Sequence, residues 1–165
     1  RRRRRPRAVS ARTCALRVAQ GHALAGDVAA CERRIADAHA LLDRPDTSDR
    51  ALGGYAGTPP YVLADEARCW LRLRSQRAIA LLEDALRIWP RESTRGRGIH
   101  QARLALGCAY SGEPERPAAE GANALDIGRS TRSTIITQQL ESLDHQLAAY
   151  DAPAVADFRE ACAAL

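Results

Sequence analysis

The stretch that decides the fold runs from Leu63 to Pro90 and reads LADEARCWLRLRSQRAIALLEDALRIWP. Its first half places apolar residues at the spacing of one helix face. They are Leu63, Ala67, Trp70 and Leu71. The second half repeats the pattern at Ala78, Leu81, Leu82, Ala85, Leu86 and Trp89. Because helices this short are marginal alone in water, the stretch predicts a helical hairpin that buries both apolar faces.

The composition favours helices over sheets. The chain has 165 residues, enough for one domain with a core of its own. Its hydrophobic content is 45%, but only 4% is aromatic, so the core must be built mostly from alanine, leucine, isoleucine and valine. Small side chains let helices approach one another closely. We therefore expect an all-α fold.

The positive charge is concentrated at the N-terminus. Six of the 25 arginines lie in RRRRRPR, residues 1–7, which leaves 19 arginines against 20 acidic residues, a net charge of −1. On total charge the body therefore lacks the basic surface of a nucleic-acid-binding fold. Residues 1–9 are predicted to be a basic disordered arm or linker. The alternative is a tail that contacts DNA or RNA, or a localisation signal.

Several chemistries are excluded by residues that the chain lacks. Without lysine it has no P-loop, and no Gly-x-Ser-x-Gly elbow is present. The histidines His22, His39, His100 and His145 have no metal-ligand spacing. Cys108 and His100 are eight residues apart on one predicted helix, too far for a nucleophile and its base. We therefore expect no enzyme activity, no cofactor and no metal.

The cysteines and the hydropathy point to a cytoplasmic protein. The five cysteines are odd in number, form no Cys-x-x-Cys pair and fall within helical patterns. Buried, reduced thiols are the simplest interpretation. No apolar run approaches the roughly 18 residues of a membrane span, and no apolar segment follows the N-terminal charges. We expect no membrane association.

Turn residues divide residues 10–165 into helices. The predicted units are hairpins at about 11–42, 61–89 and 99–127, followed by C-terminal capping helices at 131–149 and 153–164. Gly26-Asp27 is predicted to end the first helix and to cap the second. Residues 43–60 form a predicted loop, and residues 91–98, RESTRGRG, a polar linker.

The three hairpins align as an internal repeat. In the second helix of each, two positions seven residues apart recur. The pairs are Cys31 and Ala38, Ala78 and Ala85, and Pro117 and Ala124. With the Gly26-Asp27 turn and the closing Pro90, the pattern resembles the tetratricopeptide-repeat (TPR) family over residues 11–127, although the linkers are longer than the family's. The resemblance implies an α-solenoid of antiparallel helical hairpins, with about eight helices.

Three segments also resemble a narrower group. They are GYAGTPPYVLADEARCWLRL, AIALLEDALRIWP and AYSGEPERPAAEGANAL. They are similar to the C-terminal repeat region of actinobacterial helix-turn-helix (XRE-type) transcriptional regulators. The resemblance implies a sensing or dimerising arm that reaches DNA only through an N-terminal domain outside this chain. Because the chain has no methionine, we expect a fragment or a processed form.

The TPR resemblance also implies a binding site for a protein or peptide partner. In that family the first helix of each hairpin lines a concave groove that receives a peptide. The matching polar and aromatic positions are Gln20, Tyr61, Arg68, Arg72, Arg103 and Tyr110. Arg68 and Arg72 are i, i+4 neighbours that can converge on one carboxylate. The alternative is that both are solvated helix residues.

Two other functions stay open at this point. The chain could be a free-standing TPR scaffold without a DNA-related role. It could also be an oligomerisation protein, forming for example a homodimer through the amphipathic helices from Thr131 onward.

Overall fold

The computed structural model describes residues 11–41 and 58–163. These ranges contain eight α-helices and no strand, so the all-α prediction is confirmed. The helices are α1 (Ala11–Leu24), α2 (Val28–Ala40), α3 (Pro59–Arg72), α4 (Arg77–Arg87), α5 (Thr94–Ala109), α6 (Glu115–Thr131), α7 (Thr134–Leu147) and α8 (Pro153–Ala163). None of these described helices is long and apolar enough to cross a membrane. The predicted basic arm and most of the predicted loop at 43–60 lie outside the described residues.

Short turns join the first six helices into hairpins. Between α1 and α2, Gly26 has φ +75°, a left-handed conformation that glycine adopts without strain. The carboxylate of Asp27 then accepts a hydrogen bond from the backbone N–H of Ala30 at 2.9 Å. This bond satisfies one of the free donors at the start of α2, as the Gly-Asp pair predicts.

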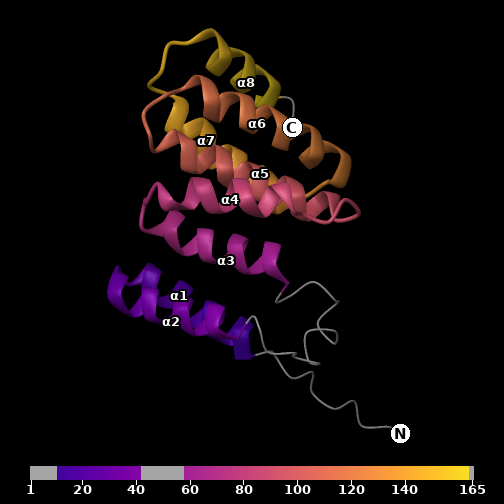
Figure 1. Cartoon of the computed structure of the whole chain (residues 1–165). Coiled ribbons are helices and arrows are strands. Elements are labelled where there is room, and N and C mark those ends of the chain that lie inside the picture. The colour runs from indigo at the N-terminus through magenta and orange to yellow at the C-terminus, as the bar shows by residue number, and fades with distance from the viewer. Residues whose placement is uncertain (1–10, 42–57, 164–165) are drawn as a thin grey trace, which may run out of the picture.

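The hairpins follow one another in chain order, from the indigo α1 and α2 to the yellow α8 (Figure 1). The helices α1, α3, α5 and α7 contact one another in sequence. In the described part of the chain, the backbones of α2 and α4, and of α4 and α6, do not pack closely. These helices meet through side chains, such as Arg77 with Glu32 at 2.9 Å and Arg116 with Glu83. The odd-numbered helices from α1 to α7 therefore form a continuous row, which we call the inner row.

The central hairpin, α3 and α4, packs as its apolar pattern predicts. Trp70 and Trp89 are 6% and 3% exposed, so both are core residues. Ala67, Ala78 and Ala85 are completely buried. Alanine at these positions lets neighbouring helices approach without leaving voids.

The predicted polar linker at 91–98 is wrong, because α5 begins at Thr94. The carbonyl of Ser93 accepts hydrogen bonds from the backbone N–H of Arg97 at 2.9 Å and from the indole of Trp89 at 3.1 Å. Gly98 is buried, and a Cβ added to it would collide with Ile127 and Ile136. Close packing at the start of α5 thus relies on a glycine and not on an apolar side chain. For this reason the sequence shows no apolar periodicity there.

The predicted boundaries of α7 and α8 differ from the structure by at most three residues. Four leucine and isoleucine residues of the predicted α7 stripe are completely buried: Ile136, Leu140, Leu143 and Leu147. Ile135, also assigned to that stripe, is 38% exposed, so this assignment is wrong. The helix turns its four-residue stripe toward α5, α6 and α8, which leaves Ile135 at its edge.

Candidate functional site

Two hollows lie along the inner row, and together we call them the groove. Hollow 1 has a volume of about 510 Å³ and is lined by Thr13, Leu16, Arg17, Tyr61, Val62, Asp65, Arg68, Trp89, Ser93, Arg95, Gly96, Ile99, His100, Arg103 and Ile135. Hollow 2 has a volume of about 360 Å³ and is lined by Arg68, Leu71, Arg72, Arg103, Leu106, Tyr110, Gln139, Ser142 and Gln146. Arg68 and Arg103 line both, so the hollows adjoin at these two guanidinium groups.

The groove is rich in arginine. Four arginines line hollow 1 and hollow 2 adds Arg72, which makes five cations, whereas the lining residues include one carboxylate, Asp65. The body outside the N-terminal arm has a net charge of only −1. Arginines therefore outnumber carboxylates along the groove, although the two charges nearly balance in the body as a whole.

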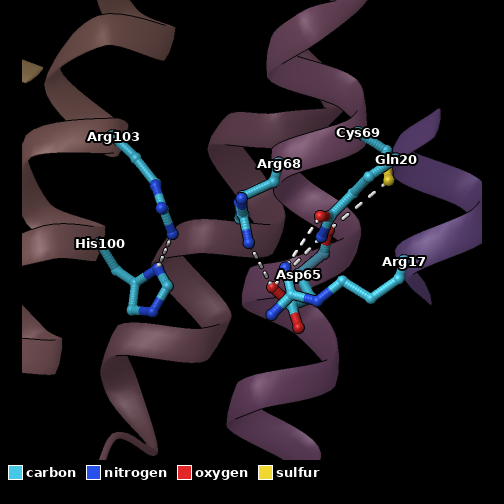
Figure 2. Close-up of polar contacts among 7 residues, drawn as sticks. All are labelled: Arg17, Gln20, Asp65, Arg68, Cys69, His100 and Arg103. Atoms are coloured by element: carbon cyan, nitrogen blue, oxygen red, sulfur yellow. Dashed lines mark hydrogen bonds and ion pairs between the residues drawn. The ribbon is translucent and has the colours of Figure 1, made fainter. Parts of the chain in front are cut away.

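Asp65 is already held by neighbouring side chains (Figure 2). Its Oδ1 accepts a hydrogen bond from Arg68 at 3.1 Å and a longer one from Gln20 at 3.4 Å. Arg17 donates to the amide oxygen of Gln20 at 3.0 Å. This chain of contacts links α1 to α3 and partly neutralises Arg68, so the excess positive charge lies on the other arginines.

Arg103 is the least hydrated cation of the groove. Burial, followed by repulsion from Arg68, lowers the pKa of Arg103 to about 10, so the side chain stays charged at neutral pH. Within the described residues, no carboxylate lies at ion-pair distance from it. A cation that has lost water without gaining a carboxylate favours an incoming anion.

His100 orients the guanidinium of Arg103. The ring nitrogen Nδ1 accepts a hydrogen bond from Arg103 at 3.3 Å (Figure 2). Because arginine has no acceptor, the proton of neutral His100 must be on Nε2. Burial first, then the charges of Arg103 and Arg68, lower the pKa of His100 to about 3. The ring is therefore neutral at pH 7 and can serve as an acceptor.

An aromatic wall supports this arrangement. The ring centroids of Tyr61 and Trp89 lie 4.5 Å apart, and those of Trp89 and His100 lie 4.4 Å apart. The indole N–H of Trp89 is fixed by the carbonyl of Ser93. Contact with the buried tryptophan, whose ring is tilted by 55° against that of His100, restrains the imidazole and through it the guanidinium of Arg103.

The six residues predicted for a peptide groove all lie on or beside the inner row. Tyr61, Arg68 and Arg103 line hollow 1, and Arg68, Arg72, Arg103 and Tyr110 line hollow 2. Gln20 lies beside them, on Asp65. Arg68 and Arg72 both reach hollow 2, with Arg68 bound to Asp65.

Sequence reasoning missed several lining residues. Arg17, Asp65, Arg95 and His100 lie in hollow 1, and Gln139, Ser142 and Gln146 line hollow 2 from α7. The residues of α7 follow i, i+3, i+7 spacing, which marks one helix face and could have predicted that they act together. Treating 131–149 as a capping or dimerising helix, and not as part of the groove, concealed this.

The described residues offer little for metal or thiol chemistry. Among them, no group of three or more histidine, cysteine, aspartate or glutamate side chains could hold a metal ion. Cys31, Cys69 and Cys108 are buried, but Cys14 is exposed and Cys162 partly so, which corrects the expectation that the thiols are buried. Burial raises the pKa of Cys69 to about 12, so its thiol is protonated and a poor nucleophile.

Compared with models of protein families, with curated proteins and with solved structures, the chain has no significant match.

Proposed function

We propose that this chain is a TPR-like module that binds an acidic segment of a partner protein or peptide in the groove. The observation that carries the proposal is the excess of five arginines over one carboxylate along the inner row. Arg103 contributes most, because its charge is partly desolvated and is held in place by His100. Binding a carboxylate there replaces hydration that Arg103 has already lost.

A peptide fits the groove better than a nucleic acid does. Asp65 stands among the arginines, and its side chain is only 21% exposed. A continuous run of phosphates would bring repeated negative charges against this carboxylate at short range. A peptide can place its carboxylates on Arg72 and Arg103 and leave a neutral residue beside Asp65.

The test uses a short peptide of glycine, serine and glutamate, acetylated and amidated so that its termini carry no charge, and a matched peptide with glutamine for glutamate. We expect calorimetry to show binding of the glutamate peptide only, weakening as salt is added. Replacing Arg72 or Arg103 by glutamine should reduce affinity about tenfold, the value of one charge-assisted hydrogen bond.

The matched control is Arg34→Gln. Arg34 lies on α2, pairs with Asp37 at 3.0 Å and is remote from the lining residues. This variant should bind like the unchanged protein. If the glutamine peptide binds equally well, or if the Arg72 and Arg103 variants keep full affinity, the groove is not the binding site for acidic peptides. A single-stranded oligonucleotide that bound more tightly than the glutamate peptide would instead favour a nucleic-acid partner.

We also propose that the module is the sensing or dimerising arm of a transcriptional regulator, on the strength of the resemblances given above. The alternative is a free-standing TPR scaffold or a homodimer. Reading the native gene upstream of the Arg1 codon distinguishes them. An encoded helix-turn-helix domain supports the regulator, whereas a start codon close to Arg1 supports the scaffold.

A further inference from the structure

The two hollows of the groove differ in chemistry on either side of the arginine pair Arg68 and Arg103. Besides its arginines, hollow 1 has an apolar part of its lining, to which the partly exposed Ile99 and Ile135 and the rings of Tyr61 and Trp89 contribute. Hollow 2 has a polar wall on α7, made by Gln139, Ser142 and Gln146. A ligand that crosses the arginine pair therefore meets an apolar surface on one side and amide groups on the other.

Ile135 indicates what kind of group hollow 1 could bind. It is 38% exposed, although the next residue, Ile136, is completely buried in the core. An exposed isoleucine costs solvation free energy that a bound apolar group would recover. Its position at a hollow of about 510 Å³ gives such a group room to enter.

We infer that the groove selects a peptide in which a large apolar residue lies next to the acidic residue. The acidic side chain binds Arg103 where the two hollows adjoin, the apolar side chain enters hollow 1 against Ile99 and Ile135, and the continuing backbone meets the amides of Gln139 and Gln146 in hollow 2. Amide side chains offer one donor group and one acceptor, which match a peptide unit. This inference rests on the proposed binding of an acidic peptide.

The experiment adds one leucine to the capped glutamate peptide, at each position within a few residues of the glutamate on either side. We expect a leucine on one side to raise affinity about fivefold or more, and a leucine on the other side to have little effect. Ile135→Ser should remove that gain.

Ile88→Ser is the matched control, because Ile88 is 51% exposed at the end of α4 and lines neither hollow. The Ile88→Ser variant should show the same increase in affinity when leucine is added to the peptide. If the glutamate peptide binds but leucine adds nothing at any position, or if Ile135→Ser keeps the gain, the selectivity is disproved and acidic-peptide binding stands. If no glutamate-containing peptide binds, both proposals are disproved.

Discussion

At the scale of single residues, the proposed site depends on Arg103, a partly buried cation whose guanidinium is held by a neutral histidine. Arg103 donates to His100, and the ring of His100 packs against that of Trp89. A protonated His100 would repel Arg103 and lose its acceptor, so burial of the ring and the nearby guanidinium groups keep the proton off. The contact between Arg103 and His100 thus requires a histidine that stays neutral well below its ordinary pKa.

The lowered pKa of His100 predicts how stability depends on pH. Its folded pKa of about 3 lies below the unfolded value of about 6.5, so between these values the unfolded chain holds a proton that the folded chain does not. The stability contribution is therefore complete above about pH 6.5 and is lost as pH falls. From there to about pH 5 the free energy of unfolding should decrease by about 2 kcal/mol.

Urea unfolding at the two pH values measures this decrease. His100→Phe keeps an aromatic ring against Trp89 but cannot titrate, so its stability should change much less over the same interval. The exposed His145 provides the control, and His145→Gln should retain the dependence of the unchanged protein. An equal pH dependence in His100→Phe would show that His100 is not the group responsible.

At the scale of helices, Gly121 allows α6 to pack closely against α7 and α8. A Cβ at Gly121 would lie 2.6 Å from Leu143 Cδ2 and 2.7 Å from Phe158 Cε2. Both side chains are almost completely buried and have no space to move into. Glycine at this position is therefore required by packing, although it lowers the intrinsic helix propensity of α6.

Gly121→Ala should consequently destabilise the protein by about 1–3 kcal/mol, because overpacking outweighs the gain in helix propensity. Gly21→Ala is the matched change, since Gly21 lies in α1 with no atom near its added Cβ. It should stabilise by about 0.5–1 kcal/mol. Urea denaturation of both variants checks the opposite signs, and a stabilised Gly121→Ala protein would contradict the packing described here.

The helices could be predicted where the sequence carries a strong local signal. Gly26-Asp27 marks a real turn and cap, and Trp70 and Trp89 mark a real core. The start of α5 could not be predicted, because Gly98 contributes to packing by having no side chain and so leaves no apolar pattern. Ile135 could not be assigned either, since two adjacent isoleucines fit one stripe about equally well until the neighbouring helices are placed.

At the scale of the whole molecule, the proposed function rests on where the charges lie. The body is nearly neutral in total, yet its described inner row gathers five arginines around one aspartate. Total charge cannot reveal this arrangement, because it does not say which residues line the groove. Arg68, Arg72 and Arg103 could be predicted from helix position, but Arg17 and Arg95 join them only through the packing of successive hairpins.

The most direct test of the proposed site is to locate the acidic peptide on the protein. Isotope-labelled protein is titrated with the capped glutamate peptide, and the backbone amide shifts are followed by nuclear magnetic resonance. The largest shifts should fall on α3 and α5 around Arg68 and Arg103, with smaller ones on α1 and α7. Shifts confined to α2, α4 and α6, or no shifts at millimolar peptide, would contradict the groove as a binding site.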